Sequence, residues 1–213
     1  MRPIAITPSA HRVLTLAVAA PLAAALVIAP AATPFSTAAL IPVASAACPD
    51  AEVVFARGRE EPPGVGAVGD ALVNSLRSKV SMSVGVYGVN YPADLSAASG
   101  ANDIRAHVQS MAGSCPNTRM VLGGYSLGAT AADLVTRANL PPDMYQHIAA
   151  VALFGNGAKR LGPAPAFAGK TIDQCADGDP ICGRGLNWPS HLQPSYLGSG
   201  LVDQAAGFIA GKL

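Results

Sequence analysis

The stretch that decides the fold is Arg119-Met-Val-Leu-Gly-Gly-Tyr-Ser-Leu-Gly-Ala-Thr-Ala-Ala-Asp-Leu-Val-Thr-Arg-Ala138. Its first six residues are typical of a buried strand, and the residues from Ala129 onward are typical of a helix. Between them, Gly124-Tyr-Ser-Leu-Gly128 fits the pattern Gly-x-Ser-x-Gly, which marks a sharp turn from strand to helix. Small residues on both sides permit this turn, which lifts the Ser126 hydroxyl above the carboxyl edge of a sheet. We therefore predict that Ser126 is a nucleophile, with backbone N–H groups at the helix start facing any oxyanion formed there.

Strands and helices alternate on both sides of this stretch. Strands are predicted at 52–58, 84–91, 119–124, 148–154 and 170–175, and helices at 66–79, 100–111, 129–138 and 201–210. This alternation predicts a mostly parallel sheet covered by helices on both faces, which is a three-layer α/β/α sandwich. The chain of 213 residues suffices for one such domain with a sizeable core.

Composition excludes several classes of protein. Charged residues make up 13% of the chain and hydrophobic residues 50%, which excludes a disordered chain. The 14 basic and 13 acidic residues give a net charge of +1, so no nucleic-acid partner is expected. Gly64-Val-Gly-Ala-Val-Gly69 fits the Gly-x-Gly-x-x-Gly pattern of dinucleotide sites, but Pro62-Pro63 separates it from the preceding strand. We interpret these glycines as a helix start with tight packing.

The first 46 residues have the pattern of a secretory signal peptide. They contain two arginines and no acidic residue, an almost purely apolar run from Val13 to Ala32, and Ala44-Ser-Ala46, which suits signal peptidase. The alternative is a retained membrane anchor, but two prolines interrupt the run and its alanines make it weakly hydrophobic. We therefore predict a signal peptide over 1–46, a mature domain over 47–213, and a secreted protein without a stable transmembrane anchor.

A serine nucleophile needs a base, and three histidines follow residue 46. His107 lies in a predicted helix upstream of Ser126, and His147 lies at the amino end of the fourth strand. His191 follows the fifth strand, which suits the order serine, acid, histidine that accompanies Gly-x-Ser-x-Gly in hydrolases. We therefore predict that His191 accepts the proton of Ser126.

The acid that orients this histidine is expected on the loop after the fifth strand. That loop reads Cys175-Ala-Asp-Gly-Asp-Pro-Ile-Cys182 and offers Asp177 and Asp179. Spacing alone does not separate these two residues. Asp173 falls within the predicted strand and is the weaker candidate.

All four cysteines follow the predicted cleavage site, so export makes disulfides the expectation. Four cysteines allow three pairings, and the sequence alone does not choose among them. The short interval between Cys175 and Cys182 favours that pair, which would leave Cys48 with Cys115. The spacings lack the paired Cys-x-x-Cys or histidine ligands of a zinc site, so no metal is expected.

Taken together, these motifs resemble those of the cutinase family. Val54-Phe-Ala-Arg-Gly58, Gly124-Tyr-Ser-Leu-Gly128 and Cys-x-x-x-Asp-x-x-Cys over 175–182, followed by His191, form an ordered set across essentially the whole mature chain. The resemblance implies Asp179 rather than Asp177 as the acid. It also supports the disulfides Cys48–Cys115 and Cys175–Cys182.

The resemblance further implies a secreted, lidless α/β-hydrolase with a five-stranded parallel sheet. Members of the family are serine esterases that need no cofactor. Their substrates are cutin or, in many bacterial members, other lipid and short-chain esters. For this chain we expect carboxylic esters with a lipid-like or short to medium acyl chain, and we expect a monomer.

Two positions depart from the family pattern. After Ala-Arg-Gly the family usually has Ser or Thr, whose amide and hydroxyl both serve the oxyanion hole, but here the residue is Arg59. Its amide remains available, while losing one oxyanion donor can cost about 2.7–4 kcal/mol in the transition state. Leu127 stands where the family often has Gln, and its backbone N–H is the second expected oxyanion donor. We expect weaker or altered activity.

The side chain of Arg59 has two interpretations, a surface pair with Glu60 or Glu61 and a contact with an anionic group of the substrate. The Arg59 departure also keeps a second function open, a secreted lipid-binding or interaction protein with this fold and little turnover. Trp188 and Leu192 flank His191, where they would either line an acyl groove or simply pack.

Overall fold

The structure is a computed structural model that describes residues 47–213. The predicted signal peptide, residues 1–46, lies outside the described residues. Within residues 47–213, no helix has the length and apolar character needed to cross a bilayer.

Five strands form one sheet in the order β2-β1-β3-β4-β5, and every neighbouring pair is parallel. The strands are Ala51–Ala56 (β1), Val84–Gly88 (β2), Arg119–Tyr125 (β3), Ile148–Phe154 (β4) and Thr171–Gln174 (β5). All six residues of β1 are buried, as expected for a parallel strand covered on both faces. The expected five-stranded α/β fold is confirmed, and β3 lies at its centre.

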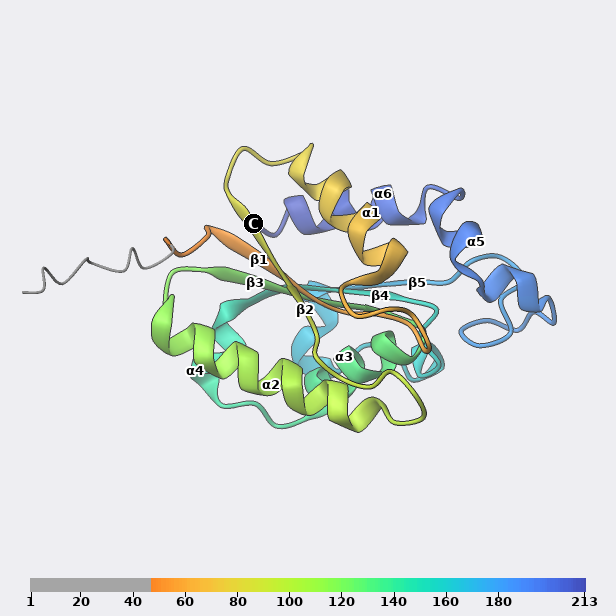
Figure 1. Cartoon of the computed structure of the whole chain (residues 1–213), viewed down its shortest axis with the longest axis horizontal. Coiled ribbons are helices and arrows are strands. Elements are labelled where there is room, and N and C mark those ends of the chain that lie inside the picture. Colours follow the sequence, from red (N-terminus) through yellow and green to blue (C-terminus); the bar gives the residue numbers. More distant parts are fainter. Residues whose placement is uncertain (1–46) are drawn as a thin grey trace, which may run out of the picture. The chain divides into compact units, whose positions relative to one another are not determined.

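Helices cover both faces of this sheet (Figure 1). The helices are Gly66–Arg77 (α1), Ala97–Ser114 (α2), Leu127–Arg137 (α3), Pro142–His147 (α4), Gln193–Leu197 (α5) and Leu201–Ala210 (α6). Helices α1 and α6 lie on one face, and α2, α3 and α4 lie on the other.

Alternate residues of β1 separate the two halves of the core. Phe55 packs with Leu72 of α1 and Ile209 of α6 in one cluster. Val54 packs with Ile104 of α2 in the other. Because successive strand residues point to opposite faces, one short strand supplies both layers.

Several boundaries differ from those predicted. Strand β1 ends at Ala56 and β2 at Gly88, which are the last of their residues that pair with a neighbouring strand. Helix α2 begins at Ala97, three residues before the predicted start, since the Ser96 hydroxyl accepts a hydrogen bond from the Ala98 N–H as a helix cap. The short helices α4 and α5 were not predicted.

Two disulfides crosslink the chain, one over a long interval and one within a single loop. Cys48, before β1, pairs with Cys115 at the end of α2, with a Cα–Cα distance of 5.5 Å. Cys175 pairs with Cys182 across the loop after β5, with a Cα–Cα distance of 5.7 Å. These are the pairs that the resemblance implied, and no cysteine between residues 47 and 213 is free.

Candidate active site

Ser126 lies at the turn between β3 and α3, at the carboxyl edge of the sheet. Its φ of 55° is in the left-handed region, which is strained for a residue with a side chain. The backbone around this turn is closely packed. A Cβ on Gly128 would lie 1.9 Å from the carbonyl oxygen of Ala56, and a Cβ on Gly124 would lie 2.2 Å from the carbonyl oxygen of Gly128. Both glycines of the pattern are therefore required by the backbone.

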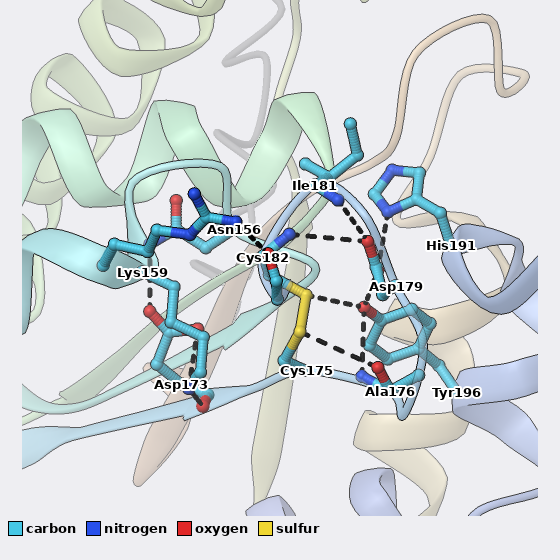
Figure 2. Close-up of a disulfide and its surroundings, with 12 residues drawn as sticks. Asn156, Lys159, Asp173, Cys175, Ala176, Asp179, Ile181, Cys182, His191 and Tyr196 are labelled. Carbon is cyan, nitrogen blue, oxygen red and sulfur yellow. Dashed lines mark hydrogen bonds and ion pairs between the residues drawn. A yellow bond between two sulfur atoms is a disulfide. The ribbon is translucent and has the colours of Figure 1, made fainter. Parts of the chain in front are cut away.

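His191 joins Ser126 to Asp179. The Ser126 Oγ lies 2.8 Å from the His191 Nε2, and the His191 Nδ1 lies 2.8 Å from the Asp179 Oδ2. Figure 2 shows the imidazole beside the carboxylate, above the Cys175–Cys182 disulfide. The three side chains come from three separate segments: the turn after β3, the loop after β5, and the 3₁₀ helix Trp188–His191.

The structure separates the two acids that spacing left open. Asp179 is fully buried and contacts His191, whereas Asp177 is exposed to solvent. Asp173 lies on β5, where its side chain accepts a hydrogen bond from Asn156 and is 3.7 Å from the ammonium of Lys159. Burial raises the pKa of Asp173, and this carboxyl does not contact His191.

The charge on Asp179 is stabilised by four donors. Its Oδ1 accepts hydrogen bonds from the N–H groups of Ile181 and Cys182, and its Oδ2 accepts from His191 and from the hydroxyl of Tyr196. Burial acts to raise the pKa of Asp179, but the hydrogen bonds outweigh it and hold that pKa below its ordinary value. An ionised Asp179 is suited to orienting a neutral imidazole and to stabilising its protonated form.

The other two histidines lie elsewhere. His107 of α2 pairs with Glu52 of β1 at 2.7 Å. The His147 Nδ1 lies 3.5 Å from the carbonyl oxygen of Thr118, at the amino end of β4. Neither contacts Ser126.

The loop Gly58–Glu61, which we call the β1 loop, lies beside Ser126. Arg59, Glu60, Ser126 and Leu127 all line one cleft. Among residues 47–213, neither the Arg59 N–H nor the Leu127 N–H donates a hydrogen bond to another backbone group. Neither amide is therefore taken up by a backbone contact of the fold.

The side chain of Arg59 forms the surface pair that was one of its two interpretations. Its Nε lies 3.8 Å from the Glu60 Oε1, and the two side chains are 56% and 82% exposed. Pairs with this exposure contribute little to stability. The guanidinium is therefore not committed to a buried structural contact.

Residues that were not predicted hold the β1 loop in place. The Glu61 carboxylate accepts hydrogen bonds from the Gly58 N–H and from the side chain of Gln193, each at 2.5 Å. Arg57 donates to the carbonyl oxygen of Glu61, and the Glu60 N–H donates to that of Ala93. Glu60 and Ala93 both have positive φ, so these bonds hold a strained backbone.

Two buried tyrosines hold the histidine segment and the acid, one each. The Tyr125 hydroxyl donates to the backbone oxygen of His191 at 2.5 Å, and the Tyr196 hydroxyl donates to Asp179. Tyr125 stands next to the predicted nucleophile, which is a sequence signal for proximity to the site. Tyr196 and Glu61 carry no such signal, because nothing local connects them to Ser126.

The cleft around Ser126 has a volume of about 640 Å³. Three partly exposed apolar side chains, those of Ile181, Trp188 and Leu192, line it. The ring centroids of Trp188 and His191 are 5.3 Å apart. Trp188 and Leu192 had two interpretations, packing in the interior and lining a groove next to His191. The structure supports the second.

Among residues 47–213, one group of side chains lies close enough together to be considered as a metal site. Cys175, Asp179 and Cys182 place ligand atoms within 4.8 Å of one another. Both sulfurs are joined in a disulfide, so neither is available as a thiolate ligand. This donor set does not fit a metal ion.

Comparisons with known proteins agree with the fold and the motifs. The family model described as Cutinase matches residues 47–213. The chain is 53% identical to the probable carboxylesterase Culp2 of Mycobacterium tuberculosis, over 95% of this chain and 97% of that protein. It is 51% identical to the phospholipase Culp4 of the same organism, over 96% of this chain and 93% of that protein. Among solved structures, Trichoderma reesei cutinase in complex with a phosphonate inhibitor aligns with a TM-score of 0.67 at 35% identity, covering 78% of this chain and 77% of that one.

Proposed function

Because the chain belongs to the cutinase family and is a carboxylic ester hydrolase, we propose that it cleaves esters through a triad of Ser126, His191 and Asp179. One observation carries this proposal. The two hydrogen bonds of 2.8 Å run from the Ser126 hydroxyl through both ring nitrogens of His191 to a buried carboxylate. This is the arrangement that activates a serine hydroxyl for attack on an acyl carbon.

The reaction proceeds in two halves. Neutral His191 removes the proton from Ser126 through Nε2 as the serine oxygen attacks the ester carbonyl carbon. The protonated imidazole then gives this proton to the leaving alcohol, which leaves an acyl group on Ser126. Water attacks the acyl-enzyme with His191 again as base, and the carboxylic acid leaves. Asp179 stays ionised and stabilises the imidazolium in both halves.

The oxyanion formed in each half is stabilised by the backbone N–H groups of Arg59 and Leu127. Two observations support this assignment: both residues line the cleft beside Ser126, and neither amide donates to another backbone group among the described residues. A side-chain hydroxyl at position 59 is lacking, so two amides act where three donors are usual in the family. Preorganised donors of this kind supply a large share of the rate enhancement.

The cleft favours substrates with an apolar acyl chain. Ile181, Trp188 and Leu192 offer apolar surface next to His191, and the exposed Arg59 lies at the same opening. The relatives carry the names carboxylesterase and phospholipase. We infer that the substrates are carboxylic esters of lipids or of short to medium acyl chains, with phospholipid acyl esters among those to test first.

We also propose that residues 1–46 are a signal peptide and that residues 47–213 form the secreted, monomeric enzyme. The basic start, apolar run and Ala44-Ser-Ala46 support export. The two disulfides in the described part of the chain suit an oxidising compartment. Mass spectrometry of the culture medium tests this proposal, with a mature amino terminus at Ala47 as the expected result.

The central test is hydrolysis of p-nitrophenyl esters from acetate to palmitate, and of phosphatidylcholine vesicles, by the wild type and by Ser126→Ala. We expect the wild type to turn over and the variant to lose about 10⁴-fold or more in kcat. The preferred chain length then measures the reach of the groove. A variant that keeps wild-type turnover would overturn the triad.

The lipid-binding alternative predicts a different result. A protein without an activated serine would bind lipid but would not react with an active-site phosphonate. The similarity to named esterases favours the hydrolase. Rapid phosphonate labelling of Ser126, absent in Ser126→Ala, is the expected outcome.

A further inference from the structure

Tyr196 of α5 contacts the proposed triad at its acid, Asp179. The side chain is fully buried, and its hydroxyl donates to the Oδ2 of Asp179, the same atom that accepts the His191 Nδ1–H (Figure 2). The Tyr196 oxygen also lies 3.4 Å from the backbone nitrogen of Ala176 and 3.4 Å from the Cys182 sulfur. A phenol and an imidazole therefore share one carboxylate oxygen.

This shared oxygen is shielded from water. Asp179 is fully buried, and its other oxygen is taken up by the N–H groups of Ile181 and Cys182. Without water to compensate, each donor strongly affects how much negative charge remains for the others. The hydrogen bond from the Tyr196 hydroxyl thus lowers the negative charge that the Asp179 Oδ2 presents to the His191 Nδ1–H.

The phenol is a permanent donor at this position. Burial, followed by the hydrogen bond to Asp179, raises the pKa of Tyr196 well above its ordinary value. A neutral phenol next to an ionised carboxylate has one useful arrangement, with its O–H pointing at the carboxylate. Tyr196 therefore keeps its proton, and can donate it in a hydrogen bond, at any pH below the ordinary pKa of a tyrosine.

Aromatic packing fixes the ring of Tyr196. Its centroid lies 5.5 Å from that of Tyr125 and 6.3 Å from that of Phe154, both in edge-on arrangements. A Cβ on Gly155 would lie 3.0 Å from the Tyr196 oxygen, so the backbone there also confines the hydroxyl. A phenylalanine keeps this ring packing and loses the hydroxyl, which donates to Asp179 and accepts from the Ala176 N–H.

We propose that Tyr196 is a positioning residue that aims the Oδ2 of Asp179 at His191 and limits how strongly the Asp179–His191 pair holds a proton. This proposal rests on the proposed triad. A carboxylate that already accepts a phenol O–H attracts the imidazolium less, so His191 loses its proton at a lower pH. The enzyme then keeps a neutral base further into the acid range.

Other groups also face His191 and stay constant in the test. The polar and charged ones come from three segments: Tyr125 on β3, Ser126 in the turn after it, and Arg59, Glu60 and Glu61 in the β1 loop. Glu61 is joined to the histidine segment by its hydrogen bond from Gln193. None of them shares the Oδ2 of Asp179. The Tyr196 hydroxyl therefore reaches the His191 ring by way of the Asp179 carboxylate.

The experiment compares pH profiles of kcat/KM for the wild type and Tyr196→Phe with a p-nitrophenyl ester. Removing the donor leaves Asp179 more basic, so the acid limb should move to higher pH by about 0.5–1 unit. The low-field proton NMR signal of the His191 Nδ1–H should shift as well, because its acceptor has changed. The control is Tyr145→Phe, which removes a phenol hydroxyl that donates to the Ala166 oxygen far from the triad, and its acid limb should stay in place.

A second variant retains the hydroxyl and reverses the sign. Replacing Tyr196 by 3-fluorotyrosine makes the phenol a stronger donor, so the acid limb should move to lower pH. This variant keeps the tyrosine shape and provides the test if Tyr196→Phe fails to fold. An acid limb that stays in place in the 3-fluorotyrosine protein and in folded Tyr196→Phe would overturn the proposal. Failure of the triad itself would be recognised separately, by Ser126→Ala retaining turnover.

Discussion

The carboxylate of Glu61 joins two segments that are 132 residues apart in the chain. One of its oxygens accepts the Gly58 N–H inside the β1 loop, and the other accepts the side chain of Gln193, two residues after His191. Glu61 thereby fixes the position of Gly58, the residue before Arg59, relative to the histidine segment. The proposed oxyanion donor, the Arg59 N–H, and the proposed base, His191, act on the same ester group. Their segments must therefore keep a fixed position relative to each other, and Glu61 contacts both segments.

We expect Glu61→Gln to lower kcat by about 10- to 100-fold with a smaller change in KM. Both oxygens of Glu61 accept hydrogen bonds, one from the Gly58 N–H and one from the Gln193 side chain. The amide of a glutamine has an NH₂ group in place of one of these oxygens, so it loses one of the two hydrogen bonds. Gln193→Ala should have a smaller effect in the same direction, and the double variant should be less than additive because both act on one contact. Steady-state kinetics with a p-nitrophenyl ester measures all three.

The matched control is Glu60→Gln. Glu60 is exposed, and within residues 47–213 its carboxylate meets only the Arg59 guanidinium, at 3.8 Å. Its loss should leave kcat close to the wild-type value. Full activity in Glu61→Gln would show that the β1 loop does not depend on this anchor.

At the scale of elements, α2 is attached to the sheet by more than apolar packing. His107 of α2 contacts Glu52 of β1 at 2.7 Å, and the ring of Tyr87 of β2 stacks on the imidazole with centroids 3.6 Å apart. The Tyr87 hydroxyl donates in turn to Asp103, one helical turn before His107. A mostly buried polar contact thus fixes the helix over β1 and β2.

We expect His107→Ala to lower the free energy of unfolding by about 1–3 kcal/mol, because the mostly buried carboxyl group of Glu52 then loses its hydrogen-bond partner. Urea denaturation followed by circular dichroism measures the change. His147→Ala is the control, since the one polar contact of His147 in the described part of the chain is its 3.5 Å approach to a backbone oxygen. Equal losses in the two variants would contradict a specific role for the Glu52–His107 pair.

The sequence predicted those elements whose signals are local. The turn around Ser126 was predictable because the two glycines and the strand and helix beside them lie within twenty residues. The helices α4 and α5 were not, since five or six residues give too little periodicity. The choice between Asp177 and Asp179 needed the family resemblance, and the structure explains it by burying only Asp179. Tyr196 and Glu61 escaped prediction because their contacts depend on how separate segments fold together.

At the scale of the whole molecule, the two disulfides have different tasks. Cys48–Cys115 closes a separation of 67 residues and ties the start of the domain to α2. Cys175–Cys182 closes only 7 residues, but these include Asp179. Loop-closure entropy makes the long crosslink the stronger stabiliser, while the short one holds part of the proposed triad.

We therefore expect opposite profiles for two double variants. Cys48→Ser with Cys115→Ser should lose about 4 kcal/mol of stability and keep kcat at temperatures where it is folded. Cys175→Ser with Cys182→Ser should lose only about 2 kcal/mol but show a clearly lower kcat, because Asp179 is released from a fixed loop. Thermal unfolding and ester hydrolysis on the same samples separate the two effects. A long-crosslink variant with the larger loss of kcat would contradict this division.

The strand order β2-β1-β3-β4-β5 has a consequence for where substrate meets the protein. The chain runs outward from β1 to β2 on one side and from β3 to β5 on the other, so the order reverses between β1 and β3. At such a topological switch point the loops leaving the two strands diverge and open a crevice at the carboxyl edge. The backbone N–H groups of Arg59 and Leu127 come from the two sides of this crevice, one after β1 and one after β3. The winding of the chain thus brings both loops to one crevice, and the proposed pair of oxyanion donors depends on this winding more than on the side chains at those two positions.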